Sequence, residues 1–266
     1  MIDAPGALIA TGDLHDNPFH LERLVEAARM DQPAAEGEPG PHLTLHEVIH
    51  ADRLVNGLDF SYRALARVAQ LKAEFPERAH VLLANHELSQ IIGAGIVKDG
   101  VRCVDAFNDG LAYVFGAEWE RVARAVERFI RSMPLALRCC GPRGDVLCAH
   151  SLPGPEGMAR FDTTILDRDL TDDDYQPRRG SAHVMVWGRG YDADQLEDLV
   201  ERWGVGLFVL GHEKADNGVL VVPPCAVVLN SDHSRGVYLP IDLGNPPRAE
   251  EAAAMVRPLA LAGDVT

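Results

Sequence analysis

The sequence predicts an α/β fold, in which strands alternate with helices around a buried core. The chain has 266 residues and is 47% hydrophobic, which is enough to bury a substantial core. Residues 42–83 show a strand, loop, helix and strand order, which is typical of a β-α-β unit. Five apolar, strand-like runs also stop abruptly at polar residues, as buried strands do where they enter loops.

The spacing of apolar residues assigns the individual elements. Strands are expected at residues 7–10, 42–52, 79–83, 135–138, 146–149, 207–210, 218–222, 226–229 and 237–243, the fourth and fifth forming a hairpin. Helices are expected at residues 17–28, 60–75, 118–131 and 194–203. Asn17 caps the first helix, and Pro76 and Pro134 end the second and third.

The remaining segments are predicted to be irregular. Residues 31–41 and 151–182 are expected to be loops, and residues 88–117 to run through Gly-rich turns. The sequence shows no internal repeat and no linker. We therefore expect a single domain over residues 1–266, with its core at about 7–243 and a tail or final helix over residues 244–266.

The composition argues against several classes of function. The chain has 40 acidic residues against 25 Lys and Arg, a formal charge of −15, which disfavours nucleic-acid and anionic-membrane partners. Its five cysteines have no CxxC spacing, so neither a disulfide framework nor a zinc ribbon is indicated. No signal peptide and no apolar run of roughly 18 residues is present. We therefore expect a cytoplasmic protein.

Polar side chains with metal-binding chemistry follow the five apolar runs. The candidate metal ligands are Asp13, His15, Asp52, Asn85, His150 and His212. Loops at the carboxyl ends of strands are where α/β proteins place ligands and catalytic groups. Carboxylate, amide and imidazole ligands without a thiolate suit Mn, Fe or Zn. The sequence therefore predicts a metal cluster, and His86, next to Asn85, is able to carry a proton.

The ordered motifs resemble those of the calcineurin-like metallophosphoesterases, over roughly residues 7–243. The motifs are Gly-Asp-x-His at residues 12–15, Asp-x-x-x-x-Gly at 52–57, Asn-His-Glu at 85–87, His150, and Gly-His at 211–212. The resemblance is strongest to the phosphoprotein phosphatase branch, which includes serine/threonine phosphatases and diadenosine-tetraphosphatase-like enzymes. It implies a four-layer αββα sandwich, with two mixed sheets face to face and helices outside.

The resemblance also implies a role for each candidate residue. Asp13 and His15 would hold one divalent metal ion, Asn85, His150 and His212 a second, and Asp52 would bridge the two. Manganese is the expected metal, with iron or zinc as alternatives. A bridging hydroxide would attack a phosphomonoester, and His86 would protonate the leaving oxygen. Arg189 and Arg53 would contact the phosphate, because a guanidinium group matches two phosphate oxygens.

The sequence departs from the family pattern in the second motif. The inner Asp-Arg pair of the family falls on Val55 and Asn56, so the carboxylate that orients the catalytic histidine is missing, with Asp59 or Glu47 as candidate replacements. Glu47 is also the alternative to Asp52 as the bridging ligand. We interpret His20, His42, His80 and His183 as structural, whereas His46, His50 and His233 stand beside strand ends.

Three functions follow from the resemblance and remain open at this point. The first is a serine/threonine phosphatase-like phosphoesterase acting on phosphoproteins or small phosphoesters. The second is a hydrolase of dinucleoside polyphosphates or nucleotides. The third is a weakened pseudophosphatase that acts as a binding module, which the retention of six candidate ligands disfavours.

Overall fold

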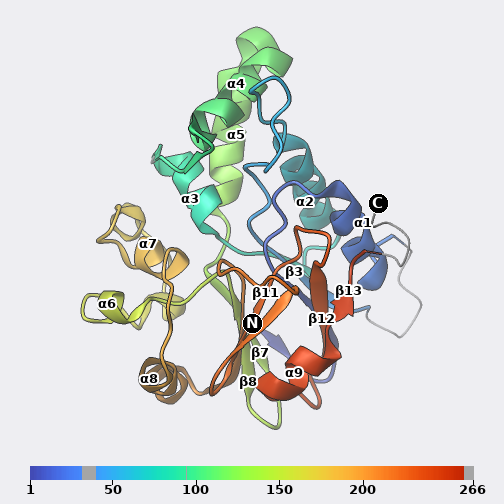
Figure 1. Cartoon of the computed structure of the whole chain (residues 1–266), viewed down its shortest axis with the longest axis vertical. Coiled ribbons are helices and arrows are strands. Elements are labelled where there is room, and N and C mark those ends of the chain that lie inside the picture. Colours follow the sequence, from blue (N-terminus) through green and yellow to red (C-terminus); the bar gives the residue numbers. More distant parts are fainter. Residues whose placement is uncertain (32–39, 94, 261–266) are drawn as a thin grey trace.

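Residues 1–31, 40–93 and 95–260 are described by a computed structural model of the chain (Figure 1). Most of the predicted loop at residues 31–41 and the end of the predicted tail, residues 261–266, lie outside these residues.

Two mixed β-sheets form the centre of the molecule. The six-stranded sheet contains, in order, β1 (Ile2–Asp3), β7 (Ala136–Cys140), β8 (Asp145–Ala149), β9 (Val205–Leu210), β11 (Ala226–Leu229) and β10 (Val219–Val222). The five-stranded sheet contains β13 (Arg257–Pro258), β12 (Val237–Asp242), β2 (Ala7–Thr11), β3 (His42–Leu45) and β4 (Ala79–Val81). Strands β5 (Val97–Lys98) and β6 (Val101–Arg102) pair separately. Within the large sheets β8, β9 and β11 are parallel to one another, as are β2, β3 and β4.

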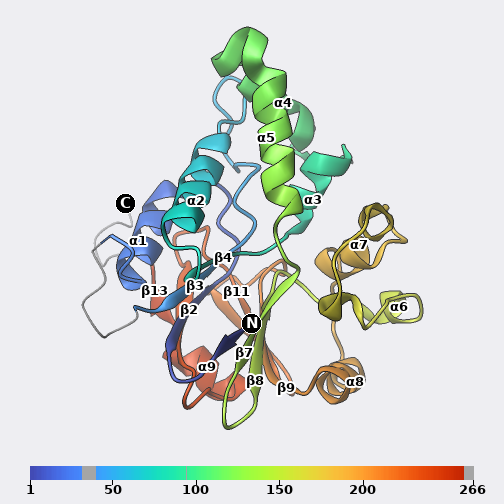
Figure 2. The same cartoon turned by 180° about the vertical axis from the view of Figure 1, so that it is seen from behind.

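Helices lie on the outer faces of both sheets and at the ends of the sandwich. They are α1 (Pro18–Ala27), α2 (Tyr62–Glu74), α3 (Asn85–Ile92), α4 (Cys103–Phe115), α5 (Trp119–Arg131), α6 (Pro155–Met158), α7 (Ser181–Val186), α8 (Ala193–Trp203) and α9 (Ala249–Met255). Figures 1 and 2 show α1 and α2 beside the five-stranded sheet and α6, α7 and α8 beside the six-stranded one, with α4 and α5 projecting from one end. Short 3-10 helical turns are also present, at Gly116–Glu118, Ile165–Asp167 and Asp172–Tyr175.

The strands are apolar on both faces, which explains the four layers. In β2, Leu8 packs into a core between the two sheets, while Ile9 packs into a second core beneath the helices. In β8, Val146 and Leu147 divide between the same two cores. Successive side chains of a strand point to opposite faces, so continuous apolar runs fit sheets that are covered on both sides. The predicted αββα sandwich is confirmed.

Most predicted elements are present, but the turns predicted between Glu87 and Glu118 are wrong. Helices α3 and α4 occupy most of this segment. In α4, Val104, Phe107 and Leu111 have helical spacing and are buried. Gly110 lowers the helix propensity of this segment, so the sequence did not predict a helix here. The glycine is nevertheless required, because a Cβ atom at this position would lie 1.9 Å from the carbonyl oxygen of Asp59.

Other expected boundaries shift as well. The run at residues 42–52 is a strand only to Leu45. Helix α9 lies within the predicted tail and packs against the sheets through the buried Ala249 and Ala252.

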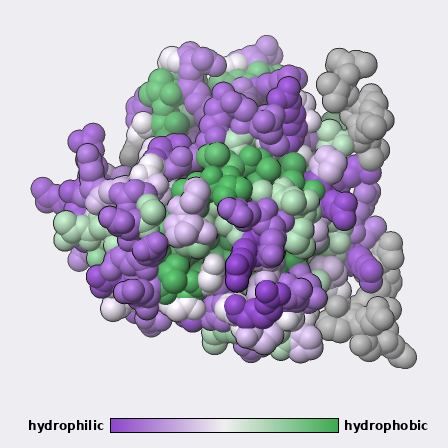
Figure 3. Space-filling view, turned by 60° about the horizontal axis from the view of Figure 1, so that its bottom comes forward, coloured by the Kyte–Doolittle hydropathy of each residue, from purple (hydrophilic) through white to green (hydrophobic). Residues whose placement is uncertain are grey.

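No helix among the described residues is both long and apolar enough to cross a membrane. On the face shown in Figure 3, hydrophilic residues surround a central hydrophobic area.

Candidate metal centre

Strand ends from both sheets meet at one rim of the sandwich. In the five-stranded sheet, β2 leads to Asp13 and His15 and β3 leads to Glu47. In the six-stranded sheet, β8 leads to His150 and β9 leads to His212. A backbone bridge from Asp13 to Asn230 joins the two sheets at this rim, and a bridge from Asp13 to His46 joins the ends of β2 and β3. The predicted convergence of strand ends is therefore present.

Two glycines allow the strand ends to approach one another. A Cβ atom at Gly12 would lie 1.9 Å from the carbonyl oxygen of Leu229. A Cβ atom at Gly211 would lie 2.3 Å from Asp13 Oδ1. Any larger residue would separate the sheets at the point where the polar side chains meet.

The backbone is strained at the same rim. Four residues here have positive φ angles: His15 (41°), Glu47 (48°), His50 (63°) and His212 (67°). Non-glycine residues rarely adopt this conformation, which costs on the order of 1–3 kcal/mol each and tends to occur at functional sites. Asn and Asp tolerate this conformation because their short side chains bond to the nearby backbone, but Glu47 has a longer side chain. The strain at Glu47 therefore indicates a functional reason for the position of its carboxylate.

Four ligand atoms converge at the first half of the centre. His150 Nε2 lies 2.7 Å from Asn85 Oδ1, 3.0 Å from Glu47 Oε2 and 3.1 Å from His212 Nδ1. All four residues are buried. Among the described residues, Glu47 Oε2 has no partner other than the His150 ring. Once His150 loses the proton at Nε2, acceptor atoms face one another in a buried site, which fits a bound cation.

The other half of the centre lies on the opposite side of the same carboxylate. His15 Nε2 is 2.8 Å from Glu47 Oε1, and His86 Nε2 is 3.7 Å from it. Groups of three ligand atoms within 4.8 Å of one another include His15 with Glu47 and His86, and Glu47 with His150 and His212. Glu47 thus belongs to both halves of the centre.

Asp13 and His46 support the ligands. Both Asp13 oxygens accept from the backbone N–H of His212 at 3.0 Å. His46 Nε2 donates to the carbonyl oxygen of Thr11 at 2.9 Å, so His46 Nδ1 accepts from His150 Nδ1, 3.2 Å away. This orientation leaves His150 Nε2 directed at the centre, as outer partners of metal-bound histidines do. Asp13 Oδ1 is also 3.4 Å from His150 Nδ1, so Asp13 belongs to the same cluster.

The prediction that Asp52 belongs to the cluster is wrong. Its exposed carboxylate pairs with Lys98 at 2.8 Å, and Glu47, the alternative, stands at the centre instead. Strand β3 ends at Leu45, so its first following carboxylate is Glu47, five residues before Asp52. Arg53 is exposed, lines a separate pocket of about 400 Å³, and contacts no residue of the centre, so its role stays a prediction.

His50 occupies the position from which a partner orients His86. The two Nδ1 atoms lie 3.1 Å apart, and His50 Nε2 is 3.0 Å from Gln90 Oε1. Gln90 Nε2 donates to Asn108 Oδ1 at 2.9 Å, which fixes the orientation of the Gln90 amide. His50 therefore donates from Nε2 and accepts at Nδ1 from His86, which leaves His86 Nε2 facing Glu47. Asp59, the other residue proposed from the sequence, instead accepts from the backbone of Ala51 and Ser61.

Glu87 holds the loop that carries Glu47. Its Oε1 accepts from the backbone N–H groups of Val48 at 2.7 Å and Ile49 at 3.2 Å. Glu87 Oε1 therefore orients the backbone of this loop. Burial raises its pKa to about 7.

Arg189 lies at the edge of the centre. Its Nη1 donates to the carbonyl oxygen of His212 at 2.8 Å, and its Nη2 lies 3.4 Å from His212 Nδ1. The residue is exposed and follows α7, so its guanidinium group is available to a ligand at the rim. This position is consistent with the predicted phosphate contact.

Metal binding is expected to release protons. Although burial lowers the pKa of both histidines, the carboxylate of Glu47 raises the pKa of His15 to about 9 and that of His150 to about 10. Both are therefore protonated at pH 7 in the metal-free protein and must lose a proton to bind a cation. Affinity for Mn²⁺ should rise with pH until these two pKa values, about 9 and about 10, are passed, with release of about two protons per chain at pH 7. Calorimetric titration in buffers of different ionisation enthalpy measures this number; a release of none would contradict the assignment.

Sequence reasoning found most of the cluster but missed the roles of two histidines. His46 and His50 were noted beside a strand end, and both now contact a site residue. His233, noted with them, contacts the backbone of Ala215 instead. The spacing Glu-x-x-His at residues 47–50, directly after a strand, is the signal that would have identified Glu47 and His50 together.

Comparisons with known proteins agree with this architecture. No family model and no curated protein matches the sequence. The structure is similar to a serine/threonine phosphatase of Saccharomyces cerevisiae, described as similar to human phosphatase PP5, with a TM-score of 0.64, 14% identity, and coverage of 91% of this chain and 76% of that one. It is also similar to a cold-active protein-tyrosine phosphatase of a psychrophilic Shewanella species, with a TM-score of 0.63, 15% identity, and coverage of 97% and 82%. At these identities the similarity shows the fold alone: the chain has the fold of these phosphatases.

Proposed function

We propose that the protein is a metal-dependent phosphoesterase that hydrolyses phosphomonoesters. The observation that carries this proposal is the buried Glu47 carboxylate, whose two oxygens face separate sets of ligand atoms. The phosphatase fold of the similar structures supports it.

The residues of the centre fit two divalent cations. His15 would hold one, Asn85, His150 and His212 would hold the other, and Glu47 would bridge them. Asp13, which the resemblance places with His15, has its carboxylate in a group with His46 and His150 instead. In the metal-free chain His150 Nε2 faces the buried Glu47 Oε2 at 3.0 Å, and a cation would take the place of the proton between them. Oxygen and nitrogen ligands without sulfur favour Mn, with Fe or Zn as alternatives.

Bound cations of this kind neutralise phosphate charge and lower the pKa of water, which supplies a nucleophile at neutral pH. The side chains then have three tasks. Arg189 holds the phosphate oxygens at the edge of the centre with its guanidinium group. Burial lowers the pKa of His86 to about 2, so its Nε2 is unprotonated at the start; it accepts the proton that the attacking water loses and delivers it to the leaving oxygen, while its Nδ1–H stays bound to His50. The buried walls around His150 exclude bulk water.

Hydrolysis of p-nitrophenyl phosphate by the purified protein tests the proposal. We expect turnover with added Mn²⁺, loss of turnover after treatment with a chelator, and recovery when Mn²⁺ is returned. Phosphopeptides and nucleotides, assayed in parallel, would define the substrate class. If the protein binds no divalent metal and none of these substrates is hydrolysed, the proposal fails.

Replacing His50 should slow turnover through the orientation of His86. We expect His50→Ala to lower kcat about 10- to 100-fold with little change in KM, because His50 lies behind His86. His50→Asp should recover part of the loss, since an aspartate Oδ atom stands at the same distance from Cβ as Nδ1 and also accepts from His86. Equal activity in both variants would contradict a positioning role, and loss of metal would indicate a structural one.

A further inference from the structure

A pocket beside the metal centre carries an unusual concentration of positive charge. It has a volume of about 290 Å³ and is lined by residues of α6, α7 and the segments that flank them. Arg160 follows α6, Arg178 precedes α7, and Arg189 follows it. Figures 1 and 2 both show α6 and α7 side by side at one edge of the sandwich. The lining contains one carboxylate, Glu156, against these three guanidinium groups.

The three arginines of this pocket are not neutralised by a carboxylate of the described chain. Among the described residues, none of them forms an ion pair with a carboxylate. In a protein with a net charge of −15, three clustered arginines without acidic partners stand out. Unneutralised guanidinium groups that share one pocket repel each other, so their placement favours an anionic ligand.

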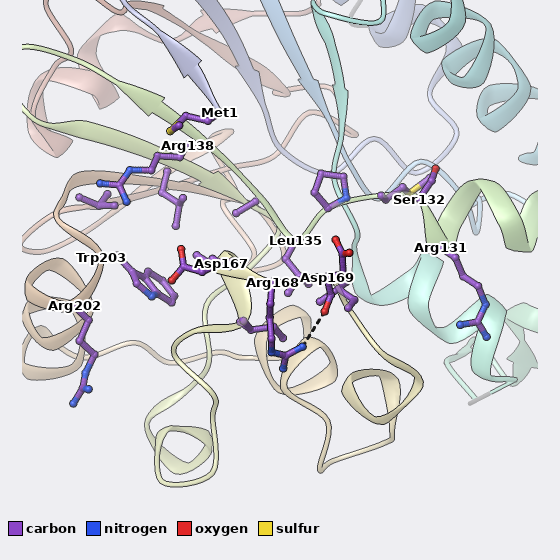
Figure 4. Close-up of a pocket in the computed structure, with 18 residues that line it drawn as sticks. Met1, Arg131, Ser132, Leu135, Arg138, Asp167, Arg168, Asp169, Arg202 and Trp203 are labelled. Carbon is purple, nitrogen blue, oxygen red and sulfur yellow. Dashed lines mark hydrogen bonds between the residues drawn. The ribbon is translucent and has the colours of Figure 1, made fainter.

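In a second, larger pocket the arginines are paired with carboxylates, in contrast to those of the first pocket. It has a volume of about 770 Å³ and lies away from the metal centre, between the end of α5 and the β7 side of the sheet (Figure 4). Its four arginines each pair with a carboxylate: Arg131 with Glu127 and Asp172, Arg138 with Asp145, Arg168 with Asp162 and Asp174, and Arg202 with Asp198. The larger pocket therefore has little charge to offer an anion.

Two residues that line the smaller pocket, Arg189 and Trp187, also lie against His212 of the metal centre. Arg189 contacts His212, and the ring of Trp187 lies 6.3 Å from the ring of His212 and 5.7 Å from that of His183. The buried indole Nε1–H of Trp187 has no acceptor within the described chain, which leaves a donor available at this wall. An anion in the pocket would therefore lie next to a phosphate held at the centre.

The backbone also fixes one arginine at the rim of this pocket. Arg178 has a φ angle of 65°, a conformation that is rare for a long side chain. Its backbone N–H donates to His183 Nδ1 at 3.2 Å, which holds this geometry. Strain of this kind persists where the surrounding structure enforces it, often at ligand sites.

We propose that this pocket binds a second phosphoryl group of the substrate, beside the phosphate that reacts at the metal centre. The inference rests on the proposed function, because it takes the reacting phosphate to lie at that centre. Arg189 stands between the two groups, and Arg160 and Arg178 hold the second one. A compact group with several oxygens suits three converging guanidinium forks better than a single carboxylate does. Substrates with adjacent phosphoryl groups are therefore preferred to simple monoesters.

Binding of non-hydrolysable analogues tests this without turnover. In calorimetric titrations at a fixed Mn²⁺ concentration, methylenediphosphonate should bind at least about tenfold more tightly than methylphosphonate, since it gains further charge-assisted hydrogen bonds. Arg160→Ala and Arg178→Ala should each weaken the diphosphonate about tenfold and methylphosphonate less than about twofold. Arg179→Ala is the matched control, because Arg179 adjoins Arg178 but does not line the pocket, and it should change neither value.

The outcomes separate this inference from the proposed function. Equal affinity of the wild type for the two analogues, or no effect of either variant, would overturn the second site even if Mn²⁺-dependent hydrolysis is present. Absence of metal and of hydrolysis would instead count against the proposed function. Phosphopeptides with glutamate or alanine beside the phosphoserine provide the last comparison. If the two variants weaken only the glutamate peptide, the pocket serves an acidic peptide and the proposal is wrong.

Discussion

Glu47→Gln is expected to remove bound metal and to lower kcat by more than about 100-fold, because loss of a partner outside the ligand shell alone costs about 10- to 100-fold. The substitution keeps the shape of the side chain and removes the charge that faces His15 and His150. Metal analysis and steady-state hydrolysis of p-nitrophenyl phosphate measure the two effects. Circular dichroism confirms that the variant is folded.

Asp52→Asn is the matched control for this prediction. Asp52 is an exposed acid five positions further along the chain, and its carboxylate pairs with Lys98. We expect this variant to keep its metal and its activity. A loss in Asp52→Asn that equals or exceeds the loss in Glu47→Gln would show that the bridging residue is misassigned.

His86→Asn is expected to lower kcat by about 10²- to 10⁴-fold, the usual contribution of a positioned proton donor. An asparagine amide can occupy the place of Nδ1 and donate to His50, so the variant deletes Nε2 while keeping the neighbouring hydrogen bond. Metal content should stay unchanged, because the proposed ligands are all present.

The metal content of the same variant decides between two roles for His86. Its Nε2 lies near the ligand atoms of His15 and Glu47, a geometry that a metal ligand would also have. If His86→Asn loses metal together with activity, His86 is a ligand and not the proton carrier. If it keeps both its metal and its full rate, another group moves the proton.

The fold and most of the centre were predictable because their signals are local. Buried strands are read from apolar runs, and the residue after a strand end is fixed by where the run stops. Four candidate ligands come within three residues of the end of such a run, and the structure brings them together: Asp13, Asn85, His150 and His212. The helix after Asn17 was equally clear, since the Asn17 side chain accepts from the backbone N–H of His20 as a cap.

The second motif was misread for a physical reason. Alignment without gaps onto the family pattern led to Asp52, but the backbone leaves the strand after Leu45 and turns at Glu47 through a positive φ angle. No glycine or asparagine stands at this position to indicate a positive φ angle, so the turn itself was not predicted. His50 then takes a place that a carboxylate was expected to fill, and only coordinates reveal the hydrogen bonds that connect it to Gln90 and His86.

The three arginines of the smaller pocket were also beyond sequence reasoning, except for Arg189. Arg160 and Arg178 lie in a segment predicted to be a loop, and nothing local distinguishes them from surface residues. They are recognised only because α6 and α7 bring them together without acidic partners.

Anomalous diffraction from a crystal of the protein soaked in Mn²⁺ would test the central claim most directly. We expect two peaks, one on each side of the Glu47 carboxylate, the first beside His15 and the second beside Asn85, His150 and His212. Well-diffracting crystals with no peak beside Glu47, or with manganese bound at Asp52 instead, would contradict it.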